Sequence, residues 1–240
     1  MMKQRLDNEL VKRGLITSRS QAESWIKLGK VTVDGRIVLK PGHFVGSNAE
    51  IKMTDEDQYV SRAGLKLASV AEILELSFTD KIVLDVGSST GGFTDYALRH
   101  GAKKVYAVDV GTNQLHPRLR RDKRIELHEK TDIRDFLLAR QIDIIVIDVS
   151  FISLRDILPH IYSELSDVNT QIVAMVKPQF EAGKGQTNKG IIKNDSMRRQ
   201  ILKDFELWVQ KYFVIDSKRD SDITGAKGNQ ERFYLLNPIF

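Results

Sequence analysis

From residue 59 to the end of the sequence, short apolar runs alternate with helical patterns. The candidate strands are KIVLDV (81–86), KVYAVDV (104–110), IDIIVIDV (142–149), QIVAMVK (171–177), FVIDSKR (213–219) and RFYLL (232–236). Several are continuously apolar, as is typical of parallel strands covered on both faces. Helical spacing of apolar residues separates the strands at 93–100, 133–140, 154–165 and 197–212. This alternation predicts an α/β fold with a doubly wound, mostly parallel sheet, whose ligands bind beyond the carboxyl ends of the strands.

The N-terminal region follows a different pattern, with two short helices expected first. The first helix is marked by apolar positions and a stopping glycine, which are Leu6, Leu10, Leu15 and Gly14. The second is predicted to begin at residues 17–18, where Gln21 completes a capping box, and to end at Gly29.

A β-hairpin is predicted next at VTVDGRIV (31–38), because Asp34-Gly35 supplies the residues of a tight turn between two β-favouring arms. The acidic, apolar-poor segment 54–58 is the predicted linker. We therefore expect a small α+β domain with its linker at 1–58 and the α/β domain at 59–240.

Positive charge is concentrated at the N-terminus. The chain has a formal net charge of +5; residues 1–52 hold 10 Lys and Arg against 5 Asp and Glu, and the remainder holds 27 of each. This asymmetry favours a polyanion-binding module on a neutral body, although a solvated basic face has the same composition. The candidate polyanion contacts are Arg5, Arg13, Arg19, Lys27 and Lys30. A second basic run, RLRRDKR (118–124), is either an auxiliary contact or a solvated helix face.

Composition excludes several classes of protein. Cysteine is absent, so there is no disulfide, thiolate metal site or cysteine nucleophile. The longest apolar stretches fall far short of the roughly 18 residues that span a bilayer. The N-terminus lacks the basic start and apolar run of a signal peptide. We expect a cytoplasmic protein with no membrane insertion.

A glycine-rich turn follows the first candidate strand, in LDVGSSTGGFTDYA (84–97). The dinucleotide fingerprint GxGxxG is not matched, because position 89 is serine. Asp85 precedes the turn, where a carboxylate suits the cationic methionine part of S-adenosylmethionine (SAM) better than a pyrophosphate. The pattern therefore favours SAM, and the residues predicted to bind it in this segment are Asp85, Gly87, Ser89, Gly91, Gly92 and Phe93.

Two further acids are candidate cofactor ligands. Asp109 ends the next strand, where an acid accepts hydrogen bonds from the ribose hydroxyls of nicotinamide and SAM cofactors alike. Asp132 follows a short strand at LHEK (127–130) and is a candidate adenine contact, although capping of the next helix explains it equally well.

Four charged residues fall where a doubly wound sheet has its active site. Asp148 and Lys177 end strands, Glu231 begins the last strand, and Lys66 lies in the segment that leads into the sheet. Each alone is more often a solvated strand-end charge than a catalytic group, but four on one rim favour a catalytic cluster.

The first 52 residues resemble an S4-type RNA-binding domain, and six ordered motifs resemble the TlyA, or hemolysin A, family. The motifs are YVSRAGLKL (59–67), DVGSSTGGFTD (85–95), VDVG (108–111), DVSFISL (148–154), MVKPQFEAG (175–183) and GNQERFYLL (228–236). The resemblance implies an S4 domain joined to an FtsJ-like methyltransferase domain that uses SAM to methylate a ribose 2′-hydroxyl in structured, ribosomal RNA. It also implies a catalytic tetrad of Lys66, Asp148, Lys177 and Glu231.

The implied mechanism needs a base for the ribose hydroxyl and needs no metal. Lys177 is the candidate base, and we expect the ammonium of Lys66 to depress its pKa. Two ordinary lysine–carboxylate salt bridges are the alternative interpretation of the tetrad. A non-enzymatic RNA-binding or ribosome-assembly factor and a nicotinamide-dependent oxidoreductase are the rival functions. The hemolysin label of the family implies a membrane activity for which the sequence offers no spanning or coating segment.

Overall fold

The computed structural model describes residues 3–16, 19–27, 29–53, 59–183, 185–192, 194–225 and 228–240. Residue contacts divide the chain into two compact units, 1–62 and 63–240. Among the described residues, no helix is both long enough and apolar enough to cross a membrane.

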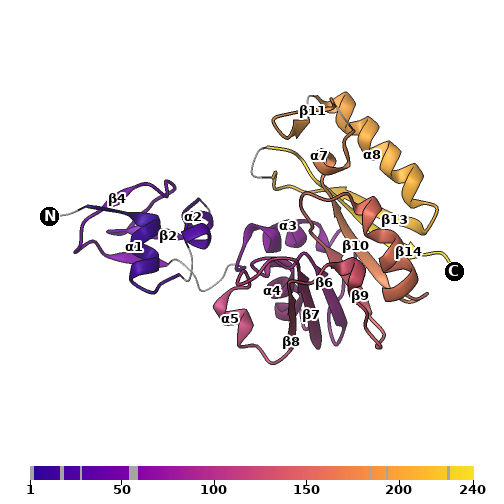
Figure 1. The fold of residues 1–240 in the computed structure, drawn as a ribbon, viewed down its shortest axis with the longest axis horizontal. Helices are drawn as coiled ribbons and strands as arrows, with labels where there is room; N and C mark the ends of the chain where they lie inside the picture. The colour runs from indigo at the N-terminus through magenta and orange to yellow at the C-terminus, as the bar shows by residue number, and fades with distance from the viewer. Residues whose placement is uncertain are drawn as a thin grey trace. The chain divides into compact units, whose positions relative to one another are not determined.

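The N-terminal unit packs two helices against a small sheet (Figure 1). The helices are α1 (Leu6–Lys12) and α2 (Arg19–Lys27). A three-stranded sheet has the order β3-β2-β5, from β2 (Val31–Val33), β3 (Arg36–Ile37) and β5 (Ile51–Met53). A second pair joins β1 (Gln4–Arg5) to β4 (Phe44–Val45). The apolar helix faces and strands enclose one core, which includes Leu6, Leu10, Trp25, Ile26 and Val31.

Most of the local predictions for this unit are confirmed. Asp34 and Gly35 both have positive φ, +50° and +77°, as the predicted tight turn requires. The helix-stopping role of Gly14 is also seen, since its φ is +68°. Leu15 was expected on the helix face, but it lies beyond the helix and is 43% exposed, while its neighbour Ile16 fills the core. The predicted capping box at 17–18 lies outside the described residues.

The C-terminal unit is built on a seven-stranded sheet with the order β13-β14-β10-β9-β6-β7-β8. Its strands are β6 (Ile82–Val86), β7 (Lys104–Asp109), β8 (Ile125–Glu129), β9 (Ile144–Ile147), β10 (Gln171–Val176), β13 (Phe213–Asp220) and β14 (Arg232–Pro238). Strand β14 runs antiparallel to both of its neighbours, and the pairings from β10 to β8 are parallel. The mostly parallel, doubly wound sheet is therefore confirmed. The strand order reverses between β6 and β9, where such sheets bind ligands.

Helices and short turns connect these strands (Figure 1). The α-helices are α3 (Arg62–Ala71), α4 (Gly92–Arg99), α5 (Pro117–Arg120), α6 (Leu158–His160), α7 (Pro178–Glu181) and α8 (Asp195–Val209). Short 3-10 helices span Ile133–Asp135 and Leu154–Asp156, a π-helix spans Ile161–Leu165, and a small hairpin joins β11 (Thr187–Asn188) to β12 (Ile191–Ile192).

The helix predicted at 133–140 is wrong beyond its first turn. The backbone becomes extended at Phe136, whose ring turns into the core and meets His128 edge-on, with 4.9 Å between ring centroids. Leu137 is left 66% exposed. Burial of one aromatic ring thus ends the helical pattern that the spacing of apolar residues suggested.

Candidate cofactor-binding and catalytic site

A pocket of about 380 Å³ opens beyond the carboxyl ends of β6, β7 and β9. It lies at the reversal of strand order, as the fold prediction required. Its polar lining comes from the predicted site residues and their neighbours, and includes Gly87, Ser89, Asp109, Gln114, Asp132 and Asp148.

The turn from β6 to α4 needs its glycines for two different reasons. Gly87 has a φ of +79°, and a Cβ there would lie 2.8 Å from the carbonyl oxygen of Asp148, so the turn packs directly on the next strand end. Gly91, with a φ of +91°, precedes α4, and a Cβ there would meet the Leu119 side chain at 2.4 Å. Gly92 is the first residue of α4.

Phe93 does not lie where a cofactor contact would place it. Its ring is 2% exposed and packs on Phe233, with 6.0 Å between ring centroids. Phe93 therefore contributes to the core beneath the turn, and its predicted contact with the cofactor is corrected. Ser89, by contrast, lines the pocket.

Asp85 is buried behind the turn. Its Oδ2 atom accepts hydrogen bonds from the backbone nitrogen and the hydroxyl of Thr94, at 2.9 and 2.6 Å. Its Oδ1 atom is buried without a hydrogen-bond partner among the described residues. Burial raises the pKa of Asp85 to about 7, partly offset by the Thr94 hydrogen bonds and reinforced by the nearby Asp148. An unsatisfied carboxylate oxygen fits a cationic ligand such as the methionine part of SAM.

Asp109 ends β7 and lines the pocket. Its Oδ2 atom accepts from the backbone nitrogen of Ser89 at 2.8 Å, and its Oδ1 atom accepts from that of Gly111 at 2.7 Å. Because a carboxylate oxygen can accept more than one hydrogen bond, both atoms can also receive ribose hydroxyls. Gln114, which the sequence prediction missed, lies beside it, with its amide nitrogen 3.4 Å from Oδ1.

Asp132 both lines the pocket and caps a helical turn. Its Oδ1 atom accepts from the backbone nitrogen of Arg134 at 3.0 Å, and its Oδ2 atom lies 2.6 Å from the guanidinium of the same residue. Hydrogen bonding to that side chain holds the pKa of Asp132 below its usual range. The capping role is therefore present, and the adenine contact stays a prediction.

The four predicted tetrad residues form two ion pairs. Lys177 Nζ lies 2.6 Å from Asp148 Oδ1 and donates a hydrogen bond to Ser150 Oγ at 2.8 Å. Lys66, on α3, is paired with Glu231 Oε2 in a buried contact. The lysine and carboxylate side chains of both pairs are at most 17% exposed. The structure thus pairs each lysine with a carboxylate.

Strand register explains why the two pairs share one edge of the sheet. Val176 on β10 is opposite Arg232 on β14, so one step further along each strand brings Lys177 opposite Glu231. Strand β9, which leads to Asp148, is the other neighbour of β10. Three adjacent strand ends therefore carry Asp148, Lys177 and Glu231.

An exposed aromatic residue beside the pocket was also missed. Phe151 lines the pocket, is 92% exposed and has a φ of +66°, which is strained for a bulky residue. The following turn is held by buried Glu181, which accepts from Ser153 Oγ at 2.6 Å and from the backbone nitrogen of Leu154 at 2.7 Å. Burial raises the pKa of Glu181 above its usual value. Phe151 lies within the motif DVSFISL, but no rule of residue spacing predicts a phenylalanine with a positive φ.

The residues of the N-terminal unit that were predicted to contact RNA differ in how exposed their side chains are. Lys30 is 2% exposed and faces the Trp25 ring, 4.9 Å from its centroid. Because its side chain is buried, the prediction that it contacts a phosphate directly is wrong. Arg5 and Arg19 both reach the buried carboxylate of Asp7, but their side chains remain 40% and 56% exposed.

The remaining two candidates differ in what can be said of them. Arg13 is paired with Glu9 at 2.9 Å and also donates to the carbonyl oxygens of Ser47 and Ala49. Its guanidinium thus ties a helix to a loop, and its side chain is 28% exposed. The Lys27 side chain lies outside the described residues.

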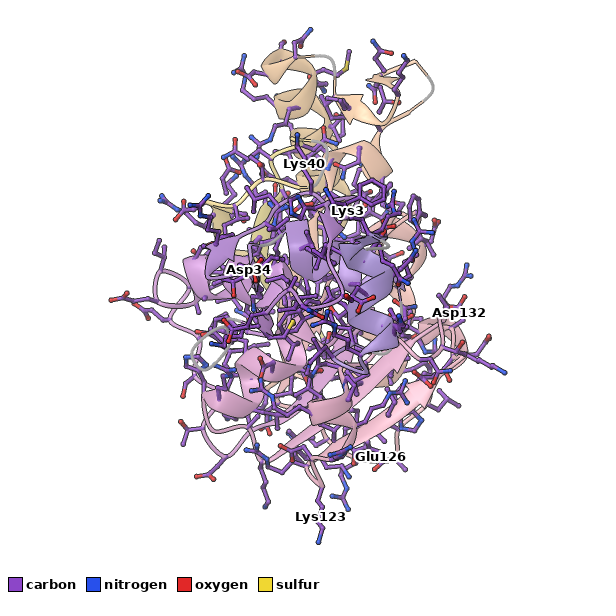
Figure 2. All side chains as sticks on the ribbon, turned by 90° about the vertical axis from the view of Figure 1, so that its left-hand side faces the viewer. Lys3, Asp34, Lys40, Lys123, Glu126 and Asp132 are labelled. Carbon is purple, nitrogen blue, oxygen red and sulfur yellow. The ribbon has the colours of Figure 1, made fainter. Side chains whose placement is uncertain are left out.

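The second basic run is largely internally paired. Arg118 reaches Asp95 at 3.0 Å, Arg120 is paired with Glu129, and Arg124 lies 2.7 Å from Asp122. Lys123 is exposed and points outward (Figure 2). Most of the cations in this run are therefore held in ion pairs at the surface around α5.

The described residues contain no group of three or more His, Asp or Glu side chains arranged to hold a metal ion. The model of the FtsJ-like methyltransferase family matches residues 59–237, which is well over half of the chain. The chain belongs to the FtsJ-like methyltransferase family. The S4 domain model matches residues 4–51.

Family membership confirms the resemblance drawn from the motifs. The FtsJ-like protein is an enzyme that transfers a methyl group from SAM. It is therefore neither a nicotinamide-dependent oxidoreductase nor a non-enzymatic assembly factor. The buried acceptor of Asp85 and the close-packed turn at Gly87 fit that cofactor.

Relatives match over almost the whole chain. A protein named Hemolysin A from Brachyspira hyodysenteriae is 42% identical, over 98% of this chain and 99% of the relative. The 16S/23S rRNA (cytidine-2′-O)-methyltransferase TlyA of Mycobacterium tuberculosis is 40% identical, over 97% of this chain and 89% of its own. A solved structure from Streptococcus thermophilus, described as a candidate hemolysin, is 40% identical with a TM-score of 0.77, covering 99% of this chain and 89% of that chain.

Proposed function

We propose that this FtsJ-like protein methylates ribose 2′-hydroxyls in ribosomal RNA, with cytidine as the first nucleotide to test. The observation that carries the proposal is the pairing of Lys177 with Asp148 and of Lys66 with Glu231 at adjacent strand ends. An S4 domain in the same chain and a relative named for cytidine 2′-O-methylation of ribosomal RNA support the choice of substrate.

Lys177 is the proposed base for the 2′-hydroxyl. Its amine follows β10, at the edge where the pocket opens, and it is oriented by Asp148 and by Ser150. As a base Lys177 must react as the neutral amine: the 2′-hydroxyl would transfer its proton to that amine, giving an ammonium, as the oxygen attacks the methyl group. Asp148 would offset the charge that the lysine gains.

Lys66 and Glu231 are proposed to complete the cluster from the β14 side. Their pairing keeps a second cation beside the strand ends without leaving a buried charge unpaired. SAM, when bound, supplies an electrophilic methyl group and a neutral thioether leaving group. Asp85, Gly87, Ser89 and Asp109 are the residues proposed to hold it, and the first and last of these supply carboxyl groups.

The S4 domain is proposed to grip the RNA backbone. Arg5 and Arg19 keep substantial exposure while Asp7 fixes their direction. Such cations supply affinity through phosphate contacts more than through sequence choice. Because ribosomal subunits are cytoplasmic particles, we infer that the enzyme acts in the cytoplasm.

Methyl transfer to ribosomal subunits tests the proposal. Purified subunits are incubated with methyl-labelled SAM, the RNA is hydrolysed with alkali, and resistant phosphodiester bonds are mapped, because a 2′-O-methyl group blocks cleavage. We expect label at a small number of alkali-resistant positions with the wild type and with Lys203→Met, which removes an exposed lysine on α8. We expect none above background with Lys177→Met. Label confined to bases, or found in no RNA, would overturn the proposal.

A further inference from the structure

The residues on both sides of Glu231 are bound by an arginine–aspartate network. Arg198, on α8, donates from Nε to the carbonyl oxygen of Gln230 at 3.0 Å and from Nη2 to Asp220 Oδ1 at 2.5 Å. Arg232 donates from Nε to the same Asp220 oxygen at 2.6 Å. The residues before and after Glu231 are thus tied to one carboxylate on β13.

Glu231 itself is held by backbone contacts from the preceding loop. Its carbonyl oxygen accepts from the backbone nitrogen of Ser221 at 3.0 Å. Its carboxylate lies against Gly225, where a Cβ would come within 2.8 Å of Oε1. The backbone nitrogen of Gly225 donates to the carbonyl oxygen of Asn229 at 2.8 Å, which ties Gly225 to the segment that leads into Glu231.

The carboxylate of Glu231 is therefore contacted on both of its oxygen atoms. Its side chain is 3% exposed, Lys66 meets Oε2, and Oε1 lies in the space that a Cβ on residue 225 would need. A methyl group on residue 225 would collide only with the end of a side chain, so the carboxylate would shift while the fold remained. A substitution at residue 225 can therefore displace the Glu231 carboxylate without removing it.

We propose that Arg198 and Gly225 are positioning residues, which set the Glu231 carboxylate against Lys66 for methyl transfer. The proposal rests on the tetrad of the proposed function and adds to it residues that touch neither substrate nor cofactor. Arg198 acts through the backbone at Gln230, and Gly225 acts by leaving space for Oε1.

Two variants and two matched controls test this in the full-length enzyme. Gly225→Ala inserts the colliding methyl group, and Arg198→Met removes both hydrogen bonds while keeping an apolar stem. Arg199→Met removes an exposed neighbouring arginine on the same helix, and Gly183→Ala adds a methyl group that finds only an ordinary contact, 3.6 Å from Gln186 Oε1. Single-turnover methyl transfer, SAM affinity by calorimetry and melting temperature are measured for each.

We expect Gly225→Ala and Arg198→Met to lower the rate constant of methyl transfer about tenfold or more, with SAM affinity within about twofold of wild type, because a small displacement of a positioned group is costly. Both controls should keep the wild-type rate constant. In a Glu231→Gln background the two variants should cause no further loss, because the group that they position is already inactive.

The outcomes separate this proposal from the one on which it rests. If Glu231→Gln is slow but Gly225→Ala and Arg198→Met keep the wild-type rate constant, the positioning proposal alone is overturned. Equal losses in the wild-type and Glu231→Gln backgrounds would also overturn it, since the two residues would then act elsewhere. If Glu231→Gln keeps the wild-type rate constant, the role of Glu231 in the proposed function fails as well.

Discussion

Proton release on cofactor binding is the sharpest consequence of the buried carboxyl group of Asp85. Its pKa is raised to about 7 by burial, although Thr94 donates two hydrogen bonds to Oδ2. The protonated carboxyl group is neutral and attracts a cation weakly. If the cationic methionine part of SAM meets the free Oδ1 atom, it must bind the ionised form.

The size of the effect follows from the ionised fraction of Asp85 in the free protein. With a pKa of about 7, that fraction rises from about 0.03 at pH 5.5 to about 0.76 at pH 7.5. SAM affinity should therefore rise about 25-fold across this window, or about 1.9 kcal/mol. The sign is fixed, because binding favours the deprotonated state and so becomes easier as the pH rises toward 7 and levels off above it. The window stops at pH 7.5 because an α-amino group loses its own proton near pH 8.

Calorimetric titration at several pH values, each in buffers of different ionisation enthalpy, measures both the affinity and the number of protons released. Two controls isolate Asp85. In Asp85→Asn the affinity should be weaker at pH 7.5 and nearly independent of pH. Methylthioadenosine, which lacks the ammonium and the sulfonium, should bind wild type with a flat profile. A flat profile for SAM, or an equally steep one for methylthioadenosine, would refute the reasoning.

Three further predictions concern stability, cofactor affinity and turnover. Without cofactor, wild type should lose stability as the pH rises from about 4 to 7, because the native state keeps a proton on Asp85 that the unfolded chain has lost; thermal unfolding of Asp85→Asn should lack this component. Asp109→Ala should weaken SAM binding by about 1 to 3 kcal/mol in the same calorimetric assay, the usual cost of removing a charge-assisted acceptor, and unchanged affinity would rule out the ribose contact. Lys177→Met should lower methyl transfer about 10²-fold or more with SAM affinity retained, a result that near-normal turnover would contradict.

The sheet could be predicted strand by strand, and the reason is physical. Parallel strands covered on both faces must be apolar at nearly every position, so runs such as 144–147 and 171–176 stand out from any helical pattern. The tight turn at Asp34-Gly35 was equally clear, since few residues tolerate positive φ. These features depend on local chemistry alone.

Features that depend on tertiary contacts could not be predicted from the sequence. Spacing could not show that Phe136 leaves its helix to reach the core, or that Phe93 packs beneath the turn rather than against a ligand. Lys30 was expected to be a surface cation because the N-terminal region carries the excess of positive charge, yet its ammonium faces Trp25. Burial of a side chain is decided by the partner it meets, and that partner is distant in the sequence.

The tetrad combines features that the sequence predicts with features that it does not. Topology predicted that Asp148, Lys177 and Glu231 share one edge, because each marks the end of a strand in the same sheet. Topology could not predict which lysine would meet which carboxylate, since Lys66 and Glu231 are 165 positions apart in the sequence and meet only in the folded chain. The chemistry of that second pair also depends on the absence of a side chain at Gly225. A site can therefore be located by its charged residues, while its precision also depends on residues such as Gly225, which carries no charge and lies outside the recognised motifs.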